Sequence, residues 1–328
     1  MKGFRKSGIK AMILIAALAA AVSIVPAALA TVSNSPDEDN AAPVAENLEY
    51  VTYKDVAING TLQAIDPEGD MLEYKLITEA KKGAVDVSED GGFTYMPREG
   101  KKGKDTFTYV AVDAMGNVSE EATVKINIEK QSSSVTYSDM EGNSAHYAAL
   151  RLAEEGIFVG EMIGDSHCFS PDTVVTRGKF LAMCMNATGA EILQDISRTG
   201  FSDDEDIALW LKPYVTTAVM SGAVRGVSGD DGGLVFAADD PITLAQAVVI
   251  LDRVMGISDV SASVSEPDSV PAWASQAAAN LSVCNVIDRG ADNDYSAEMT
   301  RADVAELIIS AIDTMEGAAG GALLSWAQ

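Results

Sequence analysis

Three six-residue stretches decide the fold: Val175–Phe180 (VTRGKF), Ile242–Ala247 (ITLAQA) and Met299–Val304 (MTRADV). Each places a threonine between an apolar residue and a segment with helical periodicity, where a helix N-cap belongs. Thr243 and Gln246 have the spacing of a capping box, and Thr300 and Asp303 approximate one. A pattern that returns at a long, nearly fixed interval predicts a repeat architecture.

The segments around these stretches carry apolar residues on one helical face. The apolar residues on the helical face of the first copy are Ala145, Ala148, Ala149 and Leu152. Those of the second copy are Val248, Leu251, Val254 and Met255, and those of the third are Val304, Ile308, Ala311, Ile312 and Met315. Such faces predict amphipathic helices that share one core. We therefore expect an all-α module after residue 136.

Residues 43–130 have a different period. Short runs alternate apolar and polar residues, at 57–62, 72–76, 93–95, 106–110 and 123–128, and Gly, Asp and Pro lie between them. Period two with these turn residues predicts an all-β sandwich. A short polar linker, 131–136, joins it to the helical part.

The first 30 residues have a basic start, an apolar run at 11–25 and the small residues Ala28 and Ala30. This pattern predicts a secretory signal peptide cleaved after Ala30, with an uncleaved anchor as the alternative. Residues 31–42 are expected to be a flexible leader, and 317–328 a tail.

The formal net charge of −26 argues against nucleic acid as a partner. It is compatible with divalent cations, and no membrane span is expected after signal cleavage. The odd set Cys168, Cys184 and Cys284 defines no disulfide framework. A Cys168–Cys184 bridge and simple apolar packing both remain open.

Residues 43–130 resemble bacterial cadherin-like or immunoglobulin-like modules of exported proteins, on GTLQAIDPEGD at 60–70, GFTYMP at 92–97 and GKDTFTYVAVD at 103–113. The resemblance implies a spacer or adhesive unit. Asp66, Glu68 and Asp70 share one turn and Asp113 follows a strand, so these four could converge on calcium. Solvated turns whose Asp side chains bind their own backbone are the alternative.

In register, the three copies resemble S-layer homology repeats, at 137–190, 199–257 and 264–316. The resemblance implies a pseudo-threefold helical unit with ligand grooves between copies, which binds pyruvylated wall polysaccharide. Each copy departs from the family pattern. Ser144 stands where the first copy should have Trp, Leu244 replaces the arginine of the second, and Asn285 replaces a loop glycine of the third. One or two competent grooves are therefore expected, around Arg177 and Arg301.

An arginine in the first turn opposes the helix dipole, so an anion should compensate it. A ligand carboxylate could do so, or an internal salt bridge to Asp139 or Asp268. Trp210 and Trp273 could stack on a sugar or pack in the core. The candidate ligand-binding residues are Arg177, Arg301, Trp210, Trp273, Asp139, Asp203, Gly156 and Gly160.

Catalytic motifs are not found: His146 and His167 have no spacing typical of a metal site or dyad, and no nucleophile elbow or phosphate loop occurs. The sequence therefore predicts a secreted, non-enzymatic cell-surface protein that is anchored to an anionic secondary cell-wall polysaccharide. Other envelope or S-layer proteins are further candidate partners. No cofactor is expected beyond structural Ca²⁺. The alternative function is calcium-dependent adhesion or envelope assembly, with the repeats as mere scaffold.

Overall fold

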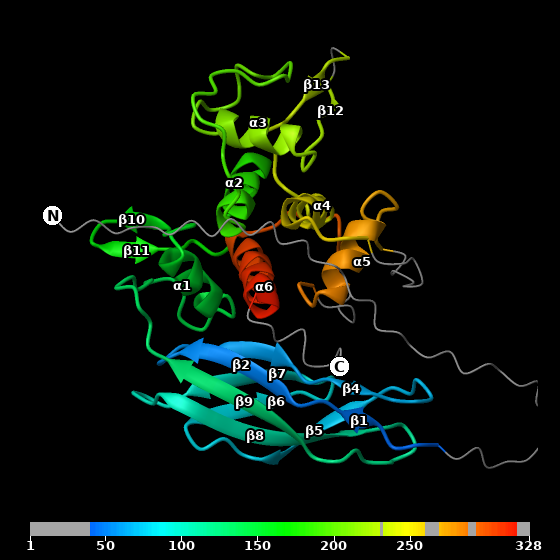
Figure 1. Ribbon diagram of the computed structural model, residues 1–328. Coiled ribbons are helices and arrows are strands. Elements are labelled where there is room, and N and C mark those ends of the chain that lie inside the picture. Colours follow the sequence, from blue (N-terminus) through cyan, green and yellow to red (C-terminus); the bar gives the residue numbers. More distant parts are fainter. Residues whose placement is uncertain (1–39, 230–231, 260–268, 288–292, 320–328) are drawn as a thin grey trace, which may run out of the picture. The chain divides into compact units, whose positions relative to one another are not determined.

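The computed structural model describes residues 40–229, 232–259, 269–287 and 293–319 (Figure 1). The predicted signal peptide, most of the leader, most of the tail and Asp268 lie outside these ranges. The chain divides into two compact units. Among the described residues, one comprises 40–173 and 301–306, and the other 174–229, 232–259, 269–287, 293–300 and 307–319.

The first unit begins with a β-sandwich, as predicted. Its strands are β1 (Val44–Ala45), β2 (Leu48–Tyr53), β3 (Ile58–Thr61), β4 (Ala64–Ile65), β5 (Glu73–Thr78), β6 (Gly83–Val87), β7 (Gly92–Pro97), β8 (Gly103–Val112) and β9 (Ala122–Glu129). They form a four-stranded sheet in the order β2-β9-β8-β5 and a three-stranded sheet in the order β3-β7-β6, while β1 pairs with β4. All pairs are antiparallel except β2 with β9.

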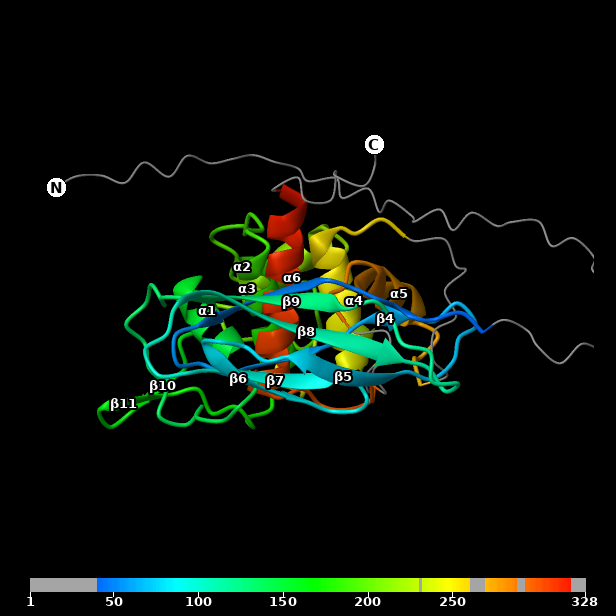
Figure 2. The ribbon, with the colours of Figure 1, turned by 90° about the horizontal axis from the view of Figure 1, so that it is seen from below.

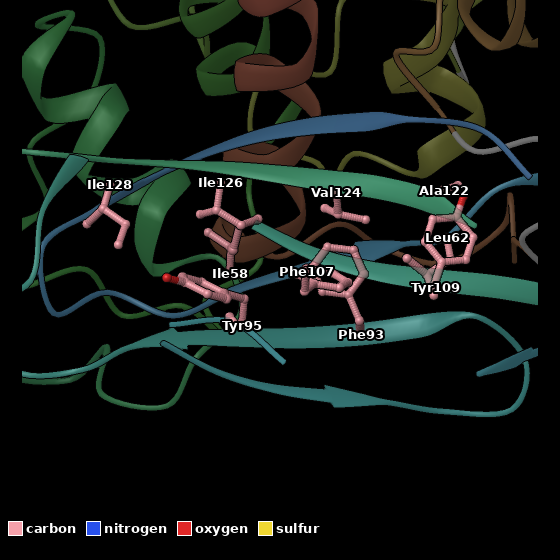
Figure 3. Close-up of a cluster of buried hydrophobic side chains, with 11 residues drawn as sticks. Ile58, Leu62, Phe93, Tyr95, Phe107, Tyr109, Ala122, Val124, Ile126 and Ile128 are labelled. Carbon is pink, nitrogen blue, oxygen red and sulfur yellow. The ribbon is translucent and has the colours of Figure 1, made fainter. Parts of the chain in front are cut away.

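Alternation along the strands explains the sandwich core. Strand β9 alternates buried and less buried residues, so Val124, Ile126 and Ile128 point inward, where they join Phe107 of β8 and Phe93 of the other sheet (Figure 3). Phe93 and Phe107 lie edge to face with ring centroids 5.3 Å apart. Burial of these side chains is the main driving force for packing the two sheets.

The first unit continues into helix α1 (His146–Glu154) and the hairpin of β10 (Glu161–Ile163) and β11 (Ser166–Cys168). The predicted linker is held by hydrogen bonds here. Glu154 accepts from the backbone N–H of Ser132 and of Ser133 and from the hydroxyl of Tyr53. The Tyr53 and Tyr147 rings lie 5.0 Å apart. These contacts attach α1 to the end of β2.

The second unit contains α2 (Arg177–Ala187), α3 (Lys212–Met220), β12 (Val227–Ser228), β13 (Leu234–Val235), α4 (Leu244–Met255), α5 (Ser275–Val283) and most of α6 (Arg301–Ala319). Helix α4 packs on α2 and α5, and α2 packs on α3. Figures 1 and 2 show these helices. The predicted apolar faces are largely buried, including Val248, Leu251, Val304 and Ile308.

The prediction that the module after residue 136 is all-α is wrong. Two hairpins, β10–β11 and β12–β13, lie in its loops, and three isolated bridges join its helix starts: Val174 with Thr300, Thr176 with Pro241, and Thr243 with Glu298. The polar Gly-rich loops can pair with themselves because their glycines adopt positive φ, as Gly164 does at 63° in the first hairpin. The chain is therefore mixed α and β.

The helix starts are joined by a closed ring of backbone hydrogen bonds. Val175 N–H donates to Met299 C=O, Met299 N–H to Ile242 C=O, and Ile242 N–H to Val175 C=O, at 2.9, 2.9 and 3.0 Å. Each quoted stretch thus gives one donor and one acceptor to its two counterparts. The ring brings together three buried apolar residues, Val175, Ile242 and Met299.

Candidate anion-binding site

Threonine caps open helices α2 and α4, which begin at Arg177 and Leu244. Thr176 accepts from Lys179 N–H at 3.5 Å, and Thr243 accepts from Gln246 N–H at 3.4 Å, as predicted. The capping box at Thr243 is only half formed, because Gln246 Oε1 is buried with no hydrogen-bond partner among the described residues.

The first two helical N–H groups are bonded in the same way at every start. Arg177 and Gly178 donate to Asp240 and Ala238, both at 2.9 Å; Leu244 and Ala245 donate to Ala297 and Tyr295, both at 3.0 Å; Arg301 and Ala302 donate to Thr173 and Pro171, at 2.8 and 3.0 Å. Groups that could have bound a ligand anion are therefore used by the protein backbone. Any anion must be held by side chains instead.

The positive charge of Arg301 is better compensated by neighbouring groups than that of Arg177. The Arg301 guanidinium lies 5.1 Å from the Phe158 ring centroid, donates to Phe169 C=O at 2.9 Å and pairs with Glu161 at 2.6 Å. The predicted internal salt bridge therefore exists here, but its partner is Glu161, which sequence reasoning missed. Phe158 was also missed as a contact, although both residues lie beside the Gly160 that the repeat pattern singled out.

Arg177 also lies against a phenylalanine ring and donates to a backbone carbonyl, but it has no carboxylate at ion-pair distance among the described residues. It is 8% exposed, its guanidinium lies 5.3 Å from the Phe236 ring centroid, and its Nη2 donates to Arg225 C=O at 3.4 Å. Its Nε is buried with no hydrogen-bond partner among the described residues. Burial lowers the pKa of the guanidinium, and the charge of Asp240 opposes this shift.

The sequence explains this difference between the two arginines. Gly160 and Gly226 are equivalent loop glycines, so Val227 occupies the position that Glu161 has in the first copy. A valine cannot accept a hydrogen bond from a guanidinium. Arg177 thus keeps a buried, under-compensated positive charge, which favours an external anion.

Asp139 and Asp203 have a clear structural role. Asp139 accepts from the backbone N–H of Phe169 and Ser170 at 2.9 and 2.7 Å, and Asp203 accepts from Phe236 and Ala237 at 2.9 and 2.8 Å. Neither forms an ion pair with an arginine in the described part of the chain. Each carboxylate instead shapes the loop that carries the aromatic residue.

A cavity of about 410 Å³ lies at the first of these loops, lined by Asp139, Ser170, Pro171, Asp172 and Thr173. Asp139 and Arg301 both bind the backbone of Phe169, so they lie close together at this loop. Hydroxyl and carboxylate groups in an open pocket are suited to sugar hydroxyls.

The remaining predicted ligand residues divide into two pairs. Trp210 and Trp273 are 54% and 61% exposed, which excludes the core-packing alternative. Gly156 and Gly160 have φ of 68° and 76° and shape the loop after α1. In the third copy, Asn285 adopts φ of 56° at the corresponding place, so this loop start keeps its conformation without the glycine.

The four predicted calcium ligands lie in turns whose aspartates bind their own backbone. Asp66 Oδ1 accepts from Glu68 and Asp70 N–H, and Asp113 Oδ1 accepts from Met115 and Asn117 N–H. No group of three or more carboxylate, His or Cys side chains arranged for a metal occurs within the described ranges. Cys168, Cys184 and Cys284 are free thiols, so the Cys168–Cys184 bridge is absent.

Comparison with known proteins places the sandwich in a class. Residues 40–130 match the family model of the bacterial cadherin-like domain, so this part of the chain is a cadherin-like module. The chain is also 27% identical over 139 residues to the surface-layer 125 kDa protein of Lysinibacillus sphaericus. That match covers 42% of this chain and 11% of that protein.

Two solved structures are similar at low scores. One is an endo-fucoidan hydrolase of glycoside hydrolase family 107, at 22% identity over 29% of this chain and 14% of that chain, with a TM-score of 0.23. The other is the sialic acid binding region of a Streptococcus sanguinis SK1 adhesin, at 21% identity, 31% and 32% coverage and a TM-score of 0.21. These scores carry no functional weight.

The surface-layer relative and the cadherin-like domain together indicate a surface or adhesion-related protein at the cell surface. Helices in the described ranges do not reach the length and apolar character that a membrane crossing needs.

Proposed function

We propose that this protein is a non-enzymatic envelope protein held by three S-layer homology repeats on a pyruvylated secondary cell-wall polysaccharide. The cadherin-like domain serves as spacer or adhesive unit. The observation that carries the proposal is the buried Arg177 guanidinium, which is stacked on Phe236 and lacks a carboxylate partner among the described residues. A ketal-linked carboxylate matches the charge and fork geometry of that group.

The proposal is tested by cosedimentation of the mature chain with purified pyruvylated wall polymer, and with the same polymer after mild acid has removed its ketal groups. Binding only to the pyruvylated form supports the proposal. Equal binding to both forms, or binding to neither, contradicts it.

We expect Arg177 and Arg301 to differ in how readily a ligand carboxylate can bind to them. Glu161 is 59% exposed in its side chain and occupies the Arg301 fork, so a ligand carboxylate must displace it. We expect Glu161→Gln to raise polymer affinity about threefold to tenfold, since an exposed ion pair is worth about 1 kcal/mol. Isothermal titration measures the change, with Asp165→Asn in the same hairpin as control.

Arg301→Leu combined with Glu161→Gln should abolish this gain. An unchanged affinity for Glu161→Gln, or a gain that persists without Arg301, would show that Glu161 does not compete for this site.

A second function, calcium-dependent adhesion, is favoured by one observation: Asp66 Oδ2 is buried with no hydrogen-bond partner among the described residues. Under this hypothesis, calcium raises the melting temperature of the full mature chain by several degrees, and Asp66→Asn removes most of the shift while Asp90→Asn does not. Thermal unfolding with and without calcium decides the question. Identical curves for the wild type exclude this function.

A further inference from the structure

A group of basic side chains gathers at the end of the sandwich where β6 and β8 begin. Three loops contribute to this basic cluster: Lys54, Lys81, Lys82, Arg98, Lys101, Lys102 and Lys104. Strand β7 ends beside the start of β6, because Gly83 pairs with Pro97. Strand β8 starts at the same end and runs toward the end where β1 and β4 lie (Figures 1 and 2).

Hydrogen bonds tie the loops of the basic cluster together. Arg98 donates from its backbone N–H to Lys82 C=O at 2.8 Å and from its guanidinium to Lys81 C=O at 3.0 Å. Lys82 Nζ donates to Lys102 C=O at 3.0 Å. The buried Asp105 carboxylate accepts from the backbone N–H of Lys81 and Lys82 at 3.0 and 2.6 Å. These hydrogen bonds thus fix the backbone of the loops that carry the charged side chains.

Acidic residues of the same loops offset only part of this positive charge, since the seven basic residues of the cluster face four acidic ones, Asp55, Glu79, Glu99 and Asp105. Asp105 is 5% exposed and satisfied by backbone donors and Tyr95, while Asp55 pairs with Lys54 at 3.0 Å. Four exposed lysines make no ion pair within the described ranges: Lys81, Lys101, Lys102 and Lys104. A concentrated positive surface is unexpected on a chain of net charge −26, so its local field must attract anions against the overall charge.

The chemistry of the cluster favours an extended polyanion. Its members without an ion pair among the described residues include four exposed lysines, which act as flexible point charges, and Arg98, whose guanidinium donates to the Lys81 carbonyl. A second copy of the chain is disfavoured, because two molecules of this net charge repel each other. We propose that the basic cluster is a second binding site, on the cadherin-like domain, for an anionic polysaccharide with closely spaced carboxylates. The site goes beyond the proposed function, since it involves neither Arg177 nor Arg301.

The test is binding of the full mature chain to immobilised polygalacturonate, with neutral dextran as blank, at low and at about 0.15 M salt. The triple variant Lys81→Gln, Lys101→Gln, Lys102→Gln removes three charges from the cluster. Its matched control, Lys75→Gln, Lys125→Gln, Lys179→Gln, removes three exposed lysines that lie outside the cluster. We expect salt-sensitive binding that the first triple weakens about tenfold or more and the control about twofold.

Equal losses in both triples would show that only total charge matters and would overturn the proposal, as would absence of binding at low salt. Sedimentation equilibrium of the wild type, run in parallel, detects the competing occupant. A dimer that the cluster triple dissolves, without polygalacturonate binding, would assign the surface to a second copy. Binding of the cluster triple to the pyruvylated wall polymer is measured separately at about 0.15 M salt, and retention of that binding with loss of polygalacturonate binding separates this site from the proposed anchoring.

Discussion

Arg177→Leu should weaken binding to pyruvylated wall polymer about a hundredfold. The substitution removes about two charge-assisted hydrogen bonds to the ligand carboxylate, worth about 3 kcal/mol together. The fold should tolerate it, because Leu244 occupies the corresponding helix position in the second copy. Removing a buried charge that lacks a carboxylate partner among the described residues also relieves a desolvation cost, so the melting temperature should stay level or rise.

The control for this prediction is Arg253→Leu, which removes an exposed arginine from the last turn of α4. Titration calorimetry and thermal unfolding of both variants give the answer. Full affinity in Arg177→Leu would refute the assignment of the anion site. A large fall in melting temperature would instead assign Arg177 a structural role, and Arg177→Lys, which keeps the charge, would then separate loss of charge from loss of packing.

Gly160→Ala should cost about 3 kcal/mol of stability. Its φ of 76° strains any residue with a Cβ, and that Cβ would lie 2.4 Å from the Cys168 carbonyl oxygen and 3.2 Å from the Tyr137 ring. The backbone of β11 would have to move, and with it Phe169 and the loop that receives Arg301.

Gly164→Ala is the matched control for Gly160→Ala. Its φ of 63° is similar, but the alanine Cβ would meet no atom within 4 Å, so only about 1 kcal/mol is expected. Urea unfolding monitored by tyrosine fluorescence measures both. Equal losses of unfolding free energy in the two variants would mean that the close approach of residue 160 to Cys168 does not contribute to the loss.

The sandwich strands and the helix starts were largely predictable because their signals are local. Alternation in 106–110 and 123–128 predicted β8 and β9, and threonine before an apolar helical face predicted the caps. Strands β1 and β4 were not predicted, since two residues show no period, and the longer strands β2 and β6 were also missed because no predicted run covered them. The hairpin β10–β11 was not predicted, because the sequence of a Gly-rich loop does not show whether the residues on its two sides form paired strands.

The contacts of the candidate site were less predictable because they join distant parts of the chain. Arg301 reaches Glu161 across 140 positions, and Arg177 reaches the loop of another copy at Arg225 and Phe236. The dipole argument required compensation for each arginine, but it named Asp139 and Asp268 as internal partners and missed Glu161. Register between copies could have identified Glu161, by comparing it with Val227 at the position after the second loop glycine.

The closed ring of Val175, Ile242 and Met299 has a consequence for the order in which parts of the chain fold. Until Met299 is in place, the N–H of Val175 and the C=O of Ile242 have no partner in the ring. Met299 lies far along the chain from both of these residues. Native pairing between such distant segments forms slowly, because the entropy of loop closure must be overcome first. A chain emerging from its N-terminus would therefore complete the cadherin-like domain early and the helical centre late. The ring can therefore close only after the third segment, Met299–Val304, has been synthesised.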